Sequence, residues 1–441
     1  MTVDVFPAVL EDLQFGAAPG VVVDSPPGAG KSTLVVRAAR HIAGSGEPLA
    51  VVAQTNEQVD DLIANLSRAE PALPIGRLSA QNYVPVPRIS EHGTVQVDTA
   101  VAGLAGCRVI IGTAAKWATL TEGSWPWAIV DEAYQMRSDA LLQVAGRFER
   151  TLFVGDPGQL DPFSTVETER WAGLSWDPQL SAVAVLLRHN PEVKVHRLPI
   201  SWRLPSSAAP VVSEAFYPFT GFAAGTGPAD RWLTFSTHAF GASPLDDTLS
   251  TAVMSGWALH ELPARHAMRT DTEVAQSCAD LALRLLERGV VATSEKTPAG
   301  SLITADRIAI GTAHRDQAAA VRQYLPPDSG ITVDTANRLQ GREYDVTIVW
   351  HPLSGRRDAT AFHLEAGRLC VLTSRHRHAC IAVARAGITE LLDAHPSTGR
   401  MYLNEVVKFP DGWEANQAVM SHLERHRVAA SDHPGRHRRT G

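Results

Sequence analysis

The chain has 441 residues, which is too long for one compact core and predicts two or three domains. Hydrophobic residues make up 44% of it and charged residues 20%, the balance of an ordinary soluble globular protein. A net charge of −7 argues against a protein that is basic over its whole surface. It leaves room for a local basic channel that binds nucleic acid.

The cysteines and the apolar runs indicate in which cellular compartment the protein is expected. The four cysteines, Cys107, Cys278, Cys370 and Cys380, form no CxxC pair and indicate no disulfide framework. No apolar run reaches the roughly 18 residues that a membrane helix needs, and the N-terminal sequence lacks the basic start of a signal peptide. We therefore expect a reduced, cytoplasmic protein without a membrane partner.

Short apolar runs that suit buried parallel strands alternate with helical stretches twice along the chain. The first series comprises residues 20–24, 49–54, 108–113, 126–132 and 150–156. The second series comprises residues 306–312, 330–335, 344–350 and 378–384. Helices are predicted over 271–289, starting on Asp271 as a cap, and over 314–325.

This alternation predicts an α/β protein with two doubly wound domains. We expect the first domain over residues 1–200 and the second over residues 201–400. Residues 63–107 leave room for a small insertion in the first domain. Residues 401–441 are expected to form a C-terminal extension with a disordered basic tail.

The stretch VVVDSPPGAGKST, residues 21–33, reads as a strand, a glycine-rich turn and the start of a helix. In a phosphate-binding loop, backbone N–H groups cradle the phosphates, a lysine neutralises the β and γ charges and a hydroxyl reaches Mg²⁺. Lys31 and Ser32 suit the last two roles, and Ser25 stands where the pattern GxxxxGK[ST] has its first glycine. Serine is small enough for that turn. The alternative is a chance glycine-rich turn.

Two further strand ends carry matching chemistry. The segment AIVDEAYQM, residues 128–136, places Asp131 and Glu132 at the end of a hydrophobic strand, where an ATPase has its metal-holding aspartate and water-activating glutamate. The next strand ends in TLFVGDPGQLDP, which carries Gln159. The alternative is an acidic pair on the surface at the start of a helix. The preceding strand and the phosphate loop favour the catalytic interpretation, with ATP and Mg²⁺ as cofactors.

Taken in order, these motifs resemble those of superfamily 1 helicases, and most of all the 5′→3′ branch that contains the nonsense-mediated-decay helicase and its RecD-like relatives. The resemblance extends over residues 15–395. In the first half SPPGAGKST is similar to motif I, AQTNEQVDDL to motif Ia, IIGTAAKW to motif Ic, DEAYQ to motif II and GDPGQLDP to motif III. In the second half LPISWRLP is similar to motif IV, VDTANRLQGREYDV to motif V and RLCVLTSRHRHACIAV to motif VI.

The resemblance implies two tandem RecA-like P-loop domains with parallel sheets. It also implies that Lys31 holds phosphate, that Ser32 and Asp131 hold Mg²⁺, that Glu132 is the general base and that Gln159 senses the γ-phosphate. The loop residues expected to contact the nucleotide are Pro27, Gly28, Ala29, Gly30, Lys31, Ser32 and Thr33.

In the second half, the resemblance implies that Arg203 and Arg375 act as arginine fingers, because a planar guanidinium matches phosphate oxygens and keeps its charge. Gly341 and Glu343 would contact the nucleotide. Trp202 precedes Arg203 where relatives carry an aromatic residue and would stack on adenine. The alternative for Trp202 is ordinary core packing.

The resemblance also implies a single-stranded nucleic acid as partner, DNA or RNA. Thr55, Asn56, Thr113 and Thr335 would contact its phosphates, and the alternative for each threonine is helix capping. We expect an ATP hydrolase that moves along the strand as a translocase or helicase, 5′→3′. The alternatives are a nucleic-acid-stimulated ATPase switch, or a motor subunit for a separate nuclease or defence partner, without unwinding of its own.

Overall fold

The computed structural model describes residues 4–160, 162, 171, 180–237, 243–267, 270–395 and 411–430. Its contacts divide the chain into two compact units. Unit 1 comprises Met1–Pro157 and Asp161–Pro199, and unit 2 comprises Gly158–Leu160 and Ile200–Gly441. Within these described ranges, no helix is long and apolar enough to cross a membrane. The basic tail was predicted over residues 428–441, of which 431–441 lie outside the described residues and 428–430 belong to unit 2.

Unit 1 is built on an eight-stranded parallel sheet with the order β4-β3-β5-β2-β6-β7-β1-β8. The strands are β1 (Gly20–Asp24), β2 (Leu49–Ala53), β3 (Ile75–Leu78), β4 (Val95–Asp98), β5 (Val109–Thr113), β6 (Trp125–Asp131), β7 (Phe148–Gly155) and β8 (Lys194–Arg197). All five strands predicted in this half are present. Strands β3 and β4, from the stretch considered as an insertion, extend the main sheet.

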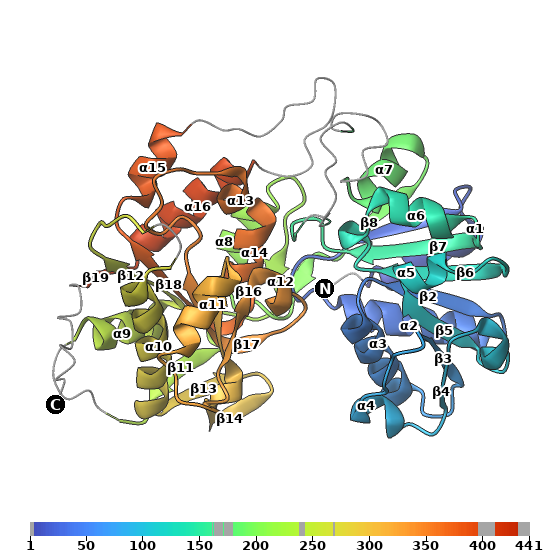
Figure 1. Cartoon of the computed structure of the whole chain (residues 1–441), viewed down its shortest axis with the longest axis horizontal. Helices are drawn as coiled ribbons and strands as arrows, with labels where there is room; N and C mark the ends of the chain where they lie inside the picture. The colour runs from blue at the N-terminus through green and yellow to red at the C-terminus, as the bar shows by residue number, and fades with distance from the viewer. Residues whose placement is uncertain are drawn as a thin grey trace. The chain divides into compact units, whose positions relative to one another are not determined.

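Helices cover the sheet of unit 1 because its strands are apolar on both faces. The helices are α1 (Phe6–Phe15), α2 (Lys31–Gly44), α3 (Asn56–Ala69), α4 (Pro87–Ser90), α5 (Ala114–Ala118), α6 (Ser138–Ala145) and α7 (Ala182–His189), with 3₁₀ turns η1 (Val101–Leu104) and η2 (Ala133–Gln135). Helices α1, α2 and α3 share one apolar core with alternate residues of β1, such as Val21 and Val23. Figure 1 shows α2 and α3 side by side.

Unit 2 contains a six-stranded parallel sheet with the order β16-β15-β17-β18-β12-β19. Its strands are β12 (Trp257–Leu262), β15 (Ile308–Thr312), β16 (Thr332–Thr335), β17 (Tyr344–Trp350), β18 (His376–Arg385) and β19 (Arg427–Ala429). Four of them were predicted. Two smaller sheets are present, β10-β9 and β11-β13-β14. Their strands are β9 (Ile200–Ser201), β10 (Ala223–Ala224), β11 (Trp232–Phe235), β13 (Val290–Ser294) and β14 (Thr297–Leu302).

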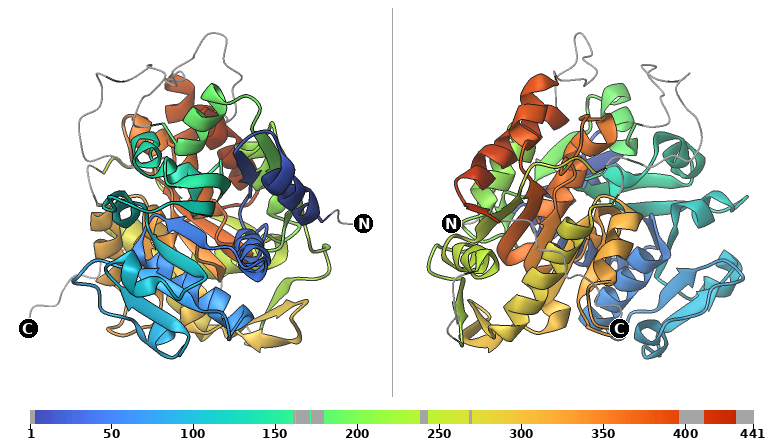
Figure 2. Two further views of the ribbon diagram at one scale, coloured as in Figure 1. Left: turned by 90° about the vertical axis from the view of Figure 1, so that its right-hand side faces the viewer. Right: turned by 60° about the vertical axis from the view of Figure 1, so that its left-hand side comes forward.

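Two apolar cores cover the two faces of this sheet. Along β18, Cys380 and Ala382 face a core with α8, α14 and α16, whereas Ile381 and Val383 face a core with α9, α10 and α11. The helices are α8 (Ala209–Phe216), α9 (Pro244–Ser255), α10 (Thr272–Glu287), α11 (Arg315–Arg322), α12 (Ala336–Leu339), α13 (Ala361–Leu364), α14 (Ala366–Thr373), α15 (Ile388–Ala394) and α16 (Gly412–Glu424), with the turn η4 (Ala305–Arg307). Figure 2 shows α15 and α16, in orange-red and red, next to each other.

The C-terminal part of the chain completes this unit. Strand β19 pairs with β12 as the edge of the six-stranded sheet, and α16 packs against α8 and α14. Leu423 and Val419 of α16 are buried in the core of that face. The described part of the predicted extension, residues 411–430, is therefore an integral part of unit 2.

A buried ion pair ties α10 to β18. Asp271 caps α10, as predicted, by accepting the backbone N–H groups of Glu273 and Val274 at 3.1 and 3.3 Å. The same carboxylate accepts Nε and Nη2 of Arg385 at 2.8 and 3.0 Å. Both side chains are buried, with 3% and 0% exposed. Arg385 also donates to Glu273, so loss of the Asp271 carboxylate would remove one of the acidic partners of this buried guanidinium.

We predict that Asp271→Ala lowers the free energy of unfolding by about 3 kcal/mol or more, because it removes a helix cap and one side of a buried ion pair together. The matched control is Asp411→Ala, since Asp411 caps α16 by accepting the N–H of Trp413 at 2.7 Å from a half-buried position. Loss of that cap should cost only about 1 kcal/mol. Denaturant unfolding of the full chain, followed by circular dichroism, compares the two. Equal losses would show that the pair with Arg385 contributes nothing.

Candidate functional site

The predicted phosphate loop has the expected strand–loop–helix context. The backbone N–H of Ser25 donates to the carbonyl of Gly155 at 2.8 Å, and Ser25 is buried at the start of the loop, 2% exposed. Gly28 and Gly30 have φ angles of 71° and 92°, in the left-handed region that favours glycine. Helix α2 begins directly afterwards at Lys31. Free N–H groups at the start of a helix attract an anion such as phosphate.

Lys31 lies between the two acidic residues of the neighbouring segment. Its Nζ is 2.7 Å from Oδ1 of Asp131 and 2.6 Å from Oε1 of Glu132. Burial acts to lower the pKa of Lys31, but the charges of Asp131 and Glu132 outweigh it and raise that pKa above its ordinary value. The ammonium is therefore permanently charged at neutral pH. It offsets part of the charge of two carboxylates that are almost fully buried.

The oxygen atoms around this point suit a magnesium–nucleotide complex. Asp131 ends β6 and Glu132 follows it, while Ser32 and Thr33 lie exposed in the first turn of α2. Carboxylate and hydroxyl oxygens are the ligands that Mg²⁺ prefers, together with phosphate oxygens of the substrate. The predicted set of Lys31, Ser32, Asp131 and Glu132 is thus assembled by two elements of unit 1.

Gln159 is grouped with unit 2. Its Oε1 accepts Nε2 of Gln340 at 2.9 Å, and a Cβ added at Gly367 would lie 2.5 Å from its carbonyl oxygen. Gln340 directly precedes Gly341, whose φ of 80° lies in the left-handed region that favours glycine. The structure therefore brings Gln159 next to the predicted motif V.

Glu343 lies between two arginines of unit 2. It accepts Nε of Arg203 at 3.2 Å and Nη1 of Arg377 at 2.9 Å. Burial acts to raise the pKa of Glu343, but the charges of Arg203 and Arg377 hold it below its ordinary value. Arg375, the other predicted finger, is 1% exposed, and its Nη2 donates to Oγ of Ser374 at 2.9 Å. Arg203 and Glu343 are brought together as the motifs suggest.

Trp202 has an exposed ring. It is 52% exposed, which separates it from a core tryptophan such as Trp257 at 1%. A Cβ added at Gly225 would lie 2.5 Å from Cε3 of Trp202, so the ring rests against a glycine. An exposed aromatic ring supported from behind is suited to stack on a base.

Arg231 lies outside the predicted motifs. Its Nη2 donates to the carbonyl of Trp202 at 2.7 Å, and Nη1 donates to the carbonyl of Arg203. Its Nε and Nη2 pair with both carboxylate oxygens of Glu295 at 2.9 and 2.6 Å. The hydrogen bond from Arg231 lowers the pKa of Glu295 to about 2. Arg231 therefore fixes the backbone of the predicted motif IV from a segment whose sequence matches no motif.

The four predicted nucleic-acid contacts lie at helix starts. Oγ1 of Thr55 accepts the N–H of Gln58 at 3.2 Å, and Oγ1 of Thr113 accepts that of Lys116 at 3.2 Å. The capping interpretation is therefore correct for both, although each hydroxyl keeps its proton to donate. Asn56 is exposed beside Thr55. Thr335 is 8% exposed at the start of α12.

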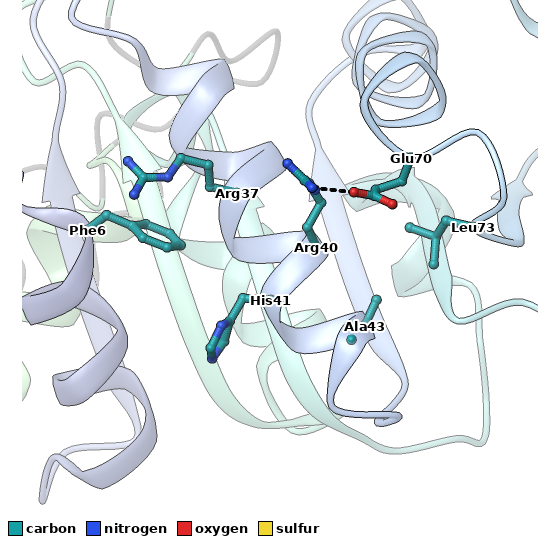
Figure 3. Close-up of a pocket in the computed structure, with 8 residues that line it drawn as sticks. Phe6, Arg37, Arg40, His41, Ala43, Glu70 and Leu73 are labelled. Atoms are coloured by element: carbon teal, nitrogen blue, oxygen red, sulfur yellow. Dashed lines mark ion pairs between the residues drawn. The ribbon is translucent and has the colours of Figure 1, made fainter.

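A hollow of about 520 Å³ lies away from this centre, along the later turns of α2. Figure 3 shows its lining, with Arg40 directed at Glu70. Arg37 pairs with Asp4, and Nη2 of Arg40 lies 2.5 Å from Oε1 of Glu70. Since carboxylates already balance these arginines, the hollow does not compete with the loop as a phosphate site.

Comparisons with known proteins agree with the two-part architecture. Residues 14–172 match one AAA domain family, and residues 185–387 match a second AAA domain family. No curated protein sequence matches the chain.

Among solved structures, the arterivirus nonstructural protein 10 helicase is 14% identical, with a TM-score of 0.45. The match covers 87% of this chain and 64% of that one. The same helicase in complex with DNA is 14% identical, with a TM-score of 0.45 and coverages of 88% and 67%. The PRRSV helicase is 12% identical, with a TM-score of 0.44 and coverages of 95% and 64%. The chain thus spans about two thirds of the length of these proteins.

The prediction of an α/β fold with two tandem RecA-like P-loop domains is confirmed by the two parallel sheets and the two family matches. Each half of the chain therefore matches an AAA domain family, over residues 14–172 and over residues 185–387.

Proposed function

We propose that this chain hydrolyses ATP in order to move along single-stranded nucleic acid, as a translocase or helicase. The observation that carries the proposal is the phosphate loop whose Lys31 contacts both Asp131 and Glu132. A lysine at the start of a helix, with its ammonium between two buried carboxylates, is typical of a P-loop ATPase. The two AAA domains support a motor of this class.

ATP would supply the phosphoanhydride bond that is hydrolysed, and Mg²⁺ would neutralise part of the charge of the phosphates. In our proposal Ser32 and Asp131 hold Mg²⁺, and the loop amides from Gly28 to Ser32 hold the phosphates. Lys31 exchanges its carboxylate partners for phosphate oxygens. Glu132, relieved of that contact, orients water and accepts its proton as the general base.

For residues of unit 2 we propose roles toward the nucleotide from the motif resemblance alone. Arg203 and Arg375 supply positive charge to the γ-phosphate during hydrolysis, and Gln159 senses that phosphate. Trp202 stacks on adenine, which its exposed ring supports. Gly341 and Glu343 contribute further nucleotide contacts. These roles follow the resemblance to superfamily 1 motifs, and the ion pair between Arg203 and Glu343 supports a common location for two of them.

The proposed strand contacts are phosphate contacts. Thr55, Asn56, Thr113 and Thr335 lie at the starts of α3, α5 and α12, where hydroxyl donors and backbone N–H groups bind phosphate without reading sequence. We therefore propose a partner that is single-stranded DNA or RNA of any sequence.

The first test measures ATP hydrolysis with and without single-stranded DNA and RNA. We predict that one of them stimulates turnover several-fold, and that Glu132→Gln lowers stimulated turnover by roughly a hundredfold or more while ATP still binds. Glutamine keeps the shape of the side chain but accepts no proton. The matched control is Glu70→Gln in the same unit, whose carboxylate pairs with Arg40 away from the loop. Unchanged turnover in Glu132→Gln would exclude Glu132 as the base.

The second test separates a motor from a switch. We predict that the chain displaces the complementary strand from duplexes with a 5′ single-stranded tail, and that 3′-tailed duplexes stay intact. The proposed polarity rests on the resemblance of DEAYQ and SWR to the 5′→3′ branch. Unwinding of 3′-tailed duplexes alone would contradict the polarity. Stimulated hydrolysis without displacement or strand-directed movement would favour the switch or a motor that works through a protein partner.

A further inference from the structure

A tyrosine of the acidic motif is bonded to the residue that precedes the phosphate loop. The hydroxyl of Tyr134 donates to Oδ1 of Asp24 at 2.5 Å. Both residues are buried, with 6% and 2% exposed. Asp24 is the last residue of β1, and Tyr134 lies in the turn η2 that follows β6. The bond therefore joins two segments that both carry residues of the proposed ATP site.

Strand order explains how the side chain reaches its partner. Strand β7 lies between β6 and β1, so Tyr134 has to pass over the end of β7. That end is Gly155, which is paired in register with Asp24. A Cβ added at Gly155 would lie 3.0 Å from Cδ2 of Tyr134 and 3.0 Å from its backbone nitrogen. The glycine thus provides the room in which the ring crosses.

The turn that Tyr134 anchors has an unusual conformation. Glu132 has φ 51° and ψ 44°, in the left-handed region, although it is not a glycine. Such a conformation costs about 1 kcal/mol or more for an L-residue with a side chain, so surrounding contacts have to maintain it. The contact of Glu132 with Lys31 is one of them. The bond of Tyr134, two residues later, is another.

We propose that Tyr134 and Asp24 are positioning residues that hold the carboxylate of Glu132 in place for hydrolysis. The proposal rests on the function proposed above, in which Glu132 is the base. Tyr134 fixes the turn that contains Glu132, and Asp24 fixes the start of the loop that contains Lys31. One hydrogen bond therefore fixes the position of the base relative to the phosphate loop.

Charge and protonation agree with this role. Burial, followed by the charge of Asp24, raises the pKa of Tyr134 well above its ordinary value. The phenol accordingly keeps its proton and remains a donor across the physiological pH range. Nε of Arg197 lies 4.0 Å from Oδ2 of Asp24, so the buried carboxylate also has a cation near its second oxygen.

The test is Tyr134→Phe, which removes the hydroxyl and keeps the ring. We expect kcat for ATP hydrolysis to fall roughly tenfold, with KM for ATP within about twofold, because a displaced base affects the chemical step more than binding. Rates are expressed per nucleotide-binding site, titrated with labelled ATP. The matched control is Tyr83→Phe, which removes a hydroxyl that donates to Asp60 at 2.9 Å elsewhere in unit 1. Its turnover without nucleic acid should equal that of the natural chain.

A double-mutant cycle distinguishes positioning of the base from general damage. Because Tyr134 acts through Glu132, adding Tyr134→Phe to Glu132→Gln should cause no further loss in single-turnover hydrolysis. Gly155→Ala places a methyl group against the ring of Tyr134. Added to Glu132→Gln, it should likewise cause no further loss in single-turnover hydrolysis. Its control is Gly44→Ala, where an added Cβ would meet no atom within 4 Å.

The outcomes separate the two proposals. Additive losses in the cycle, or full kcat in Tyr134→Phe when Glu132→Gln is slow, would overturn the positioning role and leave the proposed base intact. Full turnover in Glu132→Gln would overturn the assignment of the base itself. Equal losses of kcat in Tyr134→Phe and Tyr83→Phe would show that the bond of Tyr134 contributes only to general packing. That result would also overturn the positioning role.

Discussion

The structure of unit 1 depends on one buried charge cluster. The ammonium of Lys31 holds the carboxylates of Asp131 and Glu132 within 2.7 Å and 2.6 Å, and each charge would be costly to bury alone. The cluster exists because β1 and β6 are parallel strands that end at the same edge of one sheet. The loop after β1 turns through two glycines into α2, so the lysine returns over that edge. Attraction between opposite charges and sheet geometry thus create the same centre.

Much of this arrangement could be predicted because parallel strands buried on both faces leave continuous apolar runs. All nine predicted strands are present, with ends that differ by at most two residues. Asp271 could be predicted as a cap because helix starts select short polar side chains. The loop glycines and the strand-end carboxylates could also be predicted, because a phosphate-binding loop and an acidic strand end have characteristic sequence patterns. Local chemistry therefore located the residues for which we propose phosphate and metal contacts.

Other features depend on contacts between distant residues, which leave no local pattern. Strands β3, β4 and β19 have only four, four and three residues, too few to establish a period. Arg231 supports Trp202 and Arg203 from 28 or 29 positions away, and nothing around it signals that role. The bond of Tyr134 to Asp24 spans 110 positions and became visible only with the strand order. Sequence motifs indicate the residues for which we propose roles in catalysis and binding. The contacts that hold those residues in position are found only from the fold.

We propose that ATP binds at the charge cluster of Lys31, Asp131 and Glu132. A structure of the chain with Mg²⁺ and a non-hydrolysable ATP analogue tests this most directly. We predict that Nζ of Lys31 contacts the phosphate oxygens, that Ser32 and Asp131 lie on the side of Mg²⁺, and that Glu132 faces the terminal phosphate. An analogue bound elsewhere on the chain, or Lys31 still held between both carboxylates beside a bound nucleotide, would contradict the account.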